Sequence, residues 1–144
     1  MRYREVIHMP LWLMALIYFF MLSFVLSVWA ALGNIPALAT LLALTLLLLI
    51  ISRKSRLIIE VSESELRVGR AHIDLSFVGT VQVLDGPAMR KIRTRDANPY
   101  AFLAIRFWSS TGVTMELNDP RDETPYWLIT SNKAKDLAVA LKRN

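Results

Sequence analysis

Residues 11–32 read LWLMALIYFFMLSFVLSVWAAL, and no side chain in this run carries a charge. A helix needs roughly 20 apolar residues to cross about 30 Å of hydrocarbon, because each residue rises about 1.5 Å. Pro10 suits the first turn of such a helix, where a missing backbone N–H costs nothing. Trp12 and Trp29 lie near its ends, where indole rings favour the membrane interface. The run therefore predicts a membrane-spanning helix.

A second uncharged run follows at once and reads IPALATLLALTLLLLIIS over residues 35–52. Residues 33–36 make a tight connection, in which Pro36 is placed to begin a helix rather than to interrupt one. We therefore predict an antiparallel transmembrane hairpin with helices at about 10–32 and 35–52. It occupies a first domain of residues 1–56.

A cleaved signal peptide is the competing interpretation of the first run. Val28 and Ala30 satisfy a small-residue cleavage rule near its end. The run is longer than the apolar core of a signal peptide, which has about 7 to 15 residues, and an equally apolar run follows it. Both features favour a retained hairpin.

Basic residues near the two runs predict which way the hairpin faces. They precede the first run at Arg2 and Arg4 and follow the second at Arg53, Lys54 and Arg56, whereas the connection between the runs is uncharged. The positive-inside rule then places both termini in the cytoplasm, as in a multi-pass protein of the plasma (inner) membrane. Anionic lipid attracts such residues by about 1 kcal/mol each, so we expect the last three to contact membrane lipid.

Small residues recur at every fourth position in both runs. They are Ser23, Ser27 and Ala31 in the first run, and Ala39 and Ala43 in the second. This spacing lets helix backbones approach closely. We expect these residues to pack the two helices on each other, with packing on a second membrane protein as the alternative.

From residue 57 onward the pattern changes to short segments bounded by Gly, Pro, Asp, Asn or Ser. The clearest period of two places Val113 and Met115 on one face and Thr114 and Glu116 on the other, which predicts a strand with one buried and one wet face. The expected strands are residues 57–61, 65–69, 71–75, 78–84, 100–108, 113–118 and 126–131.

The chain ends in an expected helix at about residues 132–143. Ala134, Leu137, Ala138 and Leu141 make one apolar stripe along it, and Lys142 and Arg143 fall at its negative end. The helix therefore has one face to bury against the strands.

Strands in meander order followed by one amphipathic helix are the element order of a pleckstrin-homology-like domain. We therefore predict an α+β membrane protein in which a cytoplasmic β domain of residues 57–144 follows the hairpin. A closed barrel would remove the edge strands of so small a domain, but the long connection over residues 85–99 leaves room for an open sheet.

Several short motifs resemble those of an uncharacterised actinobacterial membrane-protein family, domain of unknown function 3093. The motifs are Tyr3-Arg4-Glu5-Val6, Leu66-Arg67-Val68-Gly69-Arg70-Ala71 with Gly79, Asp119-Pro120, and Thr124-Pro125-Tyr126-Trp127-Leu128. The resemblance covers nearly the whole chain. It implies two transmembrane helices and a cytoplasmic domain in an actinobacterial plasma membrane, and it implies no activity.

Ile73-Asp74-Leu75-Ser76 is similar to a short motif of bacterial pleckstrin-homology-like modules in small membrane proteins. That resemblance implies an interaction or scaffold role rather than catalysis.

A cluster of basic residues in the segment between strands is the main candidate binding site. It consists of Arg90, Lys91, Arg93 and Arg95, a density of charge that suits lipid phosphates or an acidic protein partner. A solvated loop near the bilayer is the alternative. We do not expect nucleic acid as a partner, because the cluster lacks the interleaved aromatic residues of a single-strand binder.

Catalytic and metal-binding patterns are weak in this sequence. Asp119, Asp122 and Glu123 lie beside prolines and suit a turn better than a cation site, and His8 and His72 lack the neighbours that zinc requires. There is no nucleophile elbow or phosphate loop. Trp108 and Trp127 are expected in the core.

We therefore predict a non-catalytic, membrane-anchored interaction or scaffold module that has no metal, cofactor or identified small-molecule substrate. An accessory subunit of a larger membrane complex is the main alternative. A membrane-associated enzyme is the second alternative.

Overall fold

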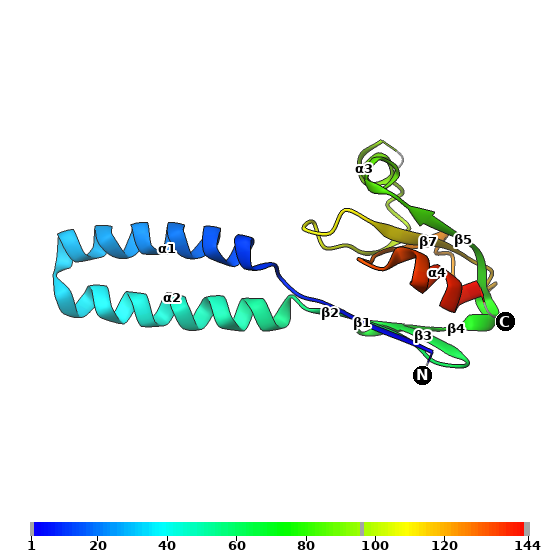
Figure 1. Ribbon diagram of the computed structural model, residues 1–144, viewed down its shortest axis with the longest axis horizontal. Coiled ribbons are helices and arrows are strands. Elements are labelled where there is room, and N and C mark those ends of the chain that lie inside the picture. Colours follow the sequence, from blue (N-terminus) through cyan, green and yellow to red (C-terminus); the bar gives the residue numbers. More distant parts are fainter. Residues whose placement is uncertain (1, 96, 143–144) are drawn as a thin grey trace. The chain divides into compact units, whose positions relative to one another are not determined.

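The two uncharged runs form two long helices joined by one residue, in a computed structural model that describes residues 2–95 and 97–142. Helix α1 spans Leu11–Leu32 and helix α2 spans Asn34–Lys54. Gly33 lies between them with a φ of 90°, a backbone conformation that glycine adopts without a steric penalty. The helices run antiparallel, as Figure 1 shows, so the predicted helical hairpin is present.

The contact between α1 and α2 is made by larger side chains than the sequence predicts. The less exposed positions recur every third or fourth residue, at Leu13, Ile17, Met21, Val25 and Val28 on α1 and at Ala37, Leu41, Leu44 and Leu48 on α2. This spacing is typical of interdigitating side chains along a helix pair.

The five small residues are all exposed, so the structure does not place them in this contact. They are Ser23, Ser27, Ala31, Ala39 and Ala43. The hydroxyl of Ser23 donates to the carbonyl of Phe19 at 3.1 Å, and that of Ser27 donates to the carbonyl of Ser23 at 3.2 Å. The expectation that they pack the hairpin on itself is corrected, because the less exposed side of each helix carries other residues.

The first sheet begins before the hairpin, which the sequence did not predict. Strands β1 (Tyr3–Ile7), β2 (Leu57–Val61), β3 (Glu65–Val68) and β4 (Ala71–Asp74) form one antiparallel sheet in that order. The predicted boundary between residues 1–56 and 57–144 is therefore corrected, because residues 3–7 belong to the β domain. Five residues next to a long apolar run carry too little pattern to be recognised as a strand.

The second sheet has the order β5-β7-β8-β6. It consists of β5 (Val78–Leu84), β6 (Phe102–Ala104), β7 (Gly112–Leu117) and β8 (Tyr126–Thr130), and only β6 runs parallel to its neighbour, β8. A 3₁₀ turn, η1 (Leu75–Phe77), connects the two sheets. The described residues thus form two separate sheets and not a closed barrel.

The connection between β5 and β6 contains a helix that the sequence does not predict. Helix α3 spans Gly86–Thr94. The side chain of Asp85 caps it by accepting a hydrogen bond from the backbone N–H of Ala88 at 2.9 Å, and Pro87 lies in its first turn. Met89 of α3 packs with Leu84 and Leu128 on one face of the second sheet.

The main core joins both sheets to the last helix, α4 (Ala134–Lys142). Fully buried side chains come from the first sheet at Ile59 and Leu66, from the second at Val113 and Met115, and from α4 at Leu137. The predicted apolar stripe of the last helix is confirmed, whereas Arg143 lies outside the described residues.

Candidate functional site

The apolar hairpin replaces the turn between two paired strands. Strand β1 ends at Ile7, which pairs with Leu57, the first residue of β2. Residues 8–10 lead into α1, and residues 55–56 lead from α2 back into the sheet. The chain therefore leaves the sheet and returns to it at neighbouring positions.

A buried carboxylate fastens β1 to the start of α4. Glu5 is 8% exposed. Its Oε2 accepts hydrogen bonds from the hydroxyls of Tyr3 at 2.7 Å and Ser131 at 2.5 Å, and its Oε1 accepts one from the backbone N–H of Asn132 at 2.9 Å. Hydrogen bonds to an ionised acceptor are the strong ones, and they offset the cost of burying the carboxylate.

Burial and the hydrogen bond to Glu5 raise the pKa of the Tyr3 phenol above its ordinary value, because both disfavour the phenolate. In the sequence, the segment around Glu5 stands out only as a family motif. Its structural role depends on a partner from the far end of the chain, so no local pattern indicates it.

Neighbouring polar groups extend this network, and each makes a hydrogen bond to another group of the β domain. Thr111 donates to the carbonyl of Ser131 at 2.6 Å, and Ser109 donates to Oδ1 of Asn132 at 2.7 Å. The backbone N–H of Lys133 donates to the hydroxyl of Ser131 at 3.1 Å. The arrangement fixes the start of α4 rather than presenting a reactive group to solvent.

The basic residues after the second apolar run lie at the end of α2. Arg53 and Lys54 occupy the last turn of α2 and Arg56 follows it, and all three are exposed. Cations are favourable at the negative end of a helix, which supports their place there.

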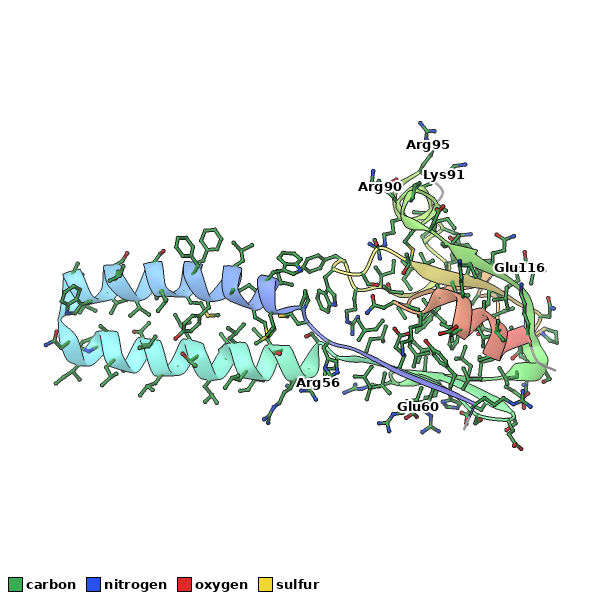
Figure 2. All side chains as sticks on the ribbon, viewed as in Figure 1. Arg56, Glu60, Arg90, Lys91, Arg95 and Glu116 are labelled. Atoms are coloured by element: carbon green, nitrogen blue, oxygen red, sulfur yellow. The ribbon has the colours of Figure 1, made fainter. Side chains whose placement is uncertain are left out.

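The second basic cluster is divided by α3. Arg90, Lys91 and Arg95 are exposed, and Figure 2 shows them on the side of α3 that points away from the second sheet. With Pro87 and Thr94 they line a shallow surface hollow of about 340 Å³. We call these three residues the α3 cationic face.

Arg93 does not belong to that face. Its Nη2 donates to the carbonyl of Ser109 at 3.1 Å, to the carbonyl of Arg106 at 3.4 Å and to Oγ1 of the buried Thr130 at 3.4 Å. Partial burial lowers its pKa from the ordinary value. Because Arg93 follows the buried Met89 by four residues, it shares the inward side of the helix.

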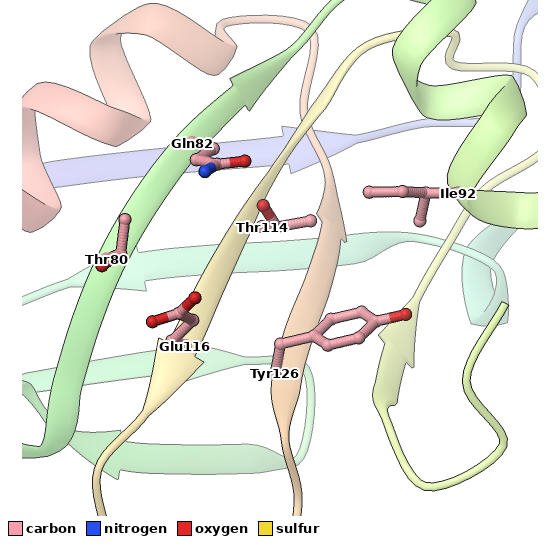
Figure 3. Close-up of a pocket in the computed structure, with 6 residues that line it drawn as sticks. All are labelled: Thr80, Gln82, Ile92, Thr114, Glu116 and Tyr126. Atoms are coloured by element: carbon pink, nitrogen blue, oxygen red, sulfur yellow. The ribbon is translucent and has the colours of Figure 1, made fainter. Parts of the chain in front are cut away.

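A groove on the outer face of the second sheet was not predicted. It has a volume of about 250 Å³ and is lined by Thr80, Gln82, Thr114, Glu116, Tyr126 and Ile92 of α3, which Figure 3 shows. The alternation in 113–118 correctly indicated that Thr114 and Glu116 point outward. The groove itself could not be inferred, because α3, which supplies one wall, was treated as loop.

The acidic turn is held by its own hydrogen bonds, and Trp127 lies in the core as expected, whereas Trp108 is only partly buried against it. Oδ1 of Asp119 accepts from the backbone N–H of Arg121 at 2.9 Å, and Oδ1 of Asp122 accepts from the hydroxyl of Thr124 at 2.7 Å. The latter bond lowers the pKa of Asp122. Trp127 is buried and its ring centroid lies 4.4 Å from that of Phe102.

The fold is thus that of an α+β chain in which an apolar two-helix hairpin is inserted into a two-sheet domain. The model of one protein family, described as "Protein of unknown function (DUF3093)", matches residues 2–141. This chain belongs to that family, which confirms the membership that its motifs indicated. No curated protein and no solved structure matches the chain.

Proposed function

We propose that the protein is a membrane-anchored, non-catalytic interaction module. Its hairpin crosses the bilayer twice and tethers the β domain to the cytoplasmic face. The observation that carries this proposal is the insertion of two long, exposed apolar helices between the paired strands β1 and β2.

The exposure of the helices supports a lipid environment. Only 6% of the apolar stretch of α1 and 11% of that of α2 are buried, whereas the core helix of a soluble domain is mostly buried. Phe19 and Phe20 are each 64% exposed, and Leu42 is also 64% exposed. Exposing apolar surface to water costs about 25 cal/mol of free energy per Å². Lipid around the helices removes this cost, so a lipid environment is favoured over water.

Strand pairing supports two crossings. Because Ile7 and Leu57 pair in one sheet, both ends of the hairpin belong on the same side of the membrane, which requires an even number of spans. Cleavage near Ala30 would remove β1 and the buried Glu5 from the domain, so a retained hairpin is favoured over a signal peptide. The exposed Arg53, Lys54 and Arg56 then favour the cytoplasmic side.

The architecture also supports a scaffold role of the pleckstrin-homology-like kind. An antiparallel four-stranded sheet, a second sheet and a C-terminal helix follow one another along the chain, which is the coarse element order of such a domain. The helix α3 and the parallel strand β6, both inserted between β5 and β7, are departures from a simple meander.

Labelling of introduced cysteines tests the topology, and the chain has no native cysteine to interfere. Ile35→Cys lies at the exposed start of α2, and Glu63→Cys lies in an exposed turn of the β domain. With a membrane-impermeant maleimide on intact cells, we expect labelling of the first variant and labelling of the second only after permeabilisation. Labelling of Glu63→Cys on intact cells would overturn the proposed orientation.

The α3 cationic face is proposed to contact anionic lipid. The test compares the full chain in nanodiscs of neutral lipid and of mixed neutral and anionic lipid, and it measures hydrogen exchange of the α3 amides. We expect slower exchange with anionic lipid, and loss of the difference at high salt or in the variant Arg90→Gln, Lys91→Gln, Arg95→Gln. Equal exchange in both nanodiscs would exclude the lipid contact.

An accessory subunit of a larger membrane complex remains the second candidate, because the stripe of Ser23, Ser27 and Ala31 is left outside the contact between the helices. Mild detergent extraction separates the candidates. A stoichiometric partner that is lost in Ser27→Leu would favour the subunit, and a lone chain in both cases would exclude it.

A further inference from the structure

The outer groove of the second sheet is shaped by an irregularity in β5. Val78 pairs with Leu117 and Val81 pairs with Met115, so two residues of β5, Gly79 and Thr80, lie opposite the single residue Glu116. Such a bulge re-aims a side chain that regular alternation would send to the other face, and bulges are over-represented next to functional sites. Here Thr80 lines the groove together with Gln82, beside Glu116 (Figure 3).

Glycine allows close packing at the first position of this bulge. A Cβ on Gly79 would lie 2.9 Å from Nδ2 of Asn118 and 3.3 Å from the Cβ of Glu116. A larger residue would therefore push β5 away from β7 at the point where Glu116 enters the groove. The close approach keeps the carboxylate next to the bulge.

The polar groups of the groove come from neighbouring positions of three strands. Gln82 pairs with Thr114, and Glu116 pairs with Tyr126, so their Cβ atoms are about 5 Å apart within each pair. Among residues 2–95 and 97–142, no hydrogen bond or ion pair engages these four side chains or that of Thr80. The groove thus presents one carboxylate, one carboxamide and several hydroxyls that make no hydrogen bond within the described residues.

We propose that this groove binds a small primary amine, with the ammonium group on Glu116 and the alkyl chain along Ile92 and the ring of Tyr126. An ammonium group has three N–H donors and no acceptor, which matches the oxygens of a carboxylate, a carboxamide and a hydroxyl. Glu116 supplies the only formal charge of the lining, so a cation is the complementary ligand. A metal ion fits less well, because the described residues contain no group of three carboxylate, histidine or cysteine ligands.

The test titrates the isotope-labelled full chain in micelles with butylamine, which is a cation at neutral pH, and uses 1-butanol as the uncharged control. We expect saturable shifts of the amide resonances of Thr80, Glu116 and Tyr126 with the amine and none with the alcohol. Glu116→Gln should weaken binding about tenfold or more, because the carboxamide keeps an acceptor oxygen but removes the negative charge that strengthens the bond to an ammonium group. Glu63 is an exposed carboxylate in the turn between β2 and β3, so Glu63→Gln is the control and should bind as the unchanged chain does.

Three results would overturn the proposal. They are equal binding by the Glu116→Gln and Glu63→Gln variants, equal shifts with butanol, and shifts that grow without saturation over the whole surface. None of these readouts depends on the side of the membrane that the β domain faces, so the amine site and the proposed topology fail or succeed separately.

Discussion

Ser131 donates a hydrogen bond of 2.5 Å to the carboxylate of Glu5, which lies 126 residues earlier in the chain. The bond joins the strand that leads into the apolar hairpin to the segment that begins α4. Residues 3–7 are therefore part of the β domain and not a tail in front of the apolar hairpin.

Loss of the Glu5 carboxylate should destabilise the β domain. Glu5→Ala leaves the hydroxyl of Ser131 and the backbone N–H of Asn132 buried without an acceptor, and we expect a cost of about 2–3 kcal/mol. Amide hydrogen exchange at Leu128, a fully buried residue of β8, measures it. Glu60→Ala breaks only the ion pair with Arg4 at the surface, at 3.2 Å, and should cost less than about 1 kcal/mol. Equal effects of the two changes would contradict the role given to Glu5.

The stability of the β domain should fall at alkaline pH through Tyr3. The pKa of this phenol is raised in the folded state above its ordinary value of 10.0, so folding favours the protonated form. The resulting stabilisation is complete below about pH 10 and is lost as the pH rises above that value. Thermal unfolding across the alkaline range should show a smaller loss in Tyr3→Phe than in the unchanged chain. Tyr100→Phe, at a residue that is 79% exposed, controls for removal of a hydroxyl.

Two glycines should respond in opposite ways to the same substitution. A Cβ on Gly112 would collide with the Met89 side chain and with the backbone carbonyl of Ile129, so we expect Gly112→Ala to cost about 3 kcal/mol or more. A Cβ on Gly86 meets no atom within 4 Å, and this residue begins α3, so Gly86→Ala should be neutral or slightly stabilising. Unfolding midpoints of the two variants check the contrast. A mild effect at Gly112 would mean that β7 and β8 shift apart easily at this position.

The sequence predicted those elements whose hydrophobic pattern lies within one continuous segment of the chain. The hairpin follows from the uncharged run that begins at Leu11, and the apolar stripe of α4 follows from residues such as Leu137. Strand β1 was missed because its partner, β2, begins only at Leu57, and strand pairing across such an insertion leaves no local trace. Helix α3 is too short for its period to stand out, so the inward turn of Arg93 and the wall at Ile92 were missed with it.

If the helical hairpin only connects β1 to β2, a short β-turn should be able to connect these strands in its place. Residues 2–7 joined through Asn-Gly to residues 57–142 would connect Ile7 to Leu57, which are already paired, and Asn-Gly favours the two-residue turn of a β-hairpin. We expect a soluble, folded domain with dispersed amide resonances and protection at Met115, which is fully buried. The matched control is residues 57–142 alone, which lack β1 and Glu5 and should aggregate or show no protection. If the control folds as well as the joined chain, β1 is dispensable. If the joined chain does not fold, the helices stabilise the domain beyond closing its first turn.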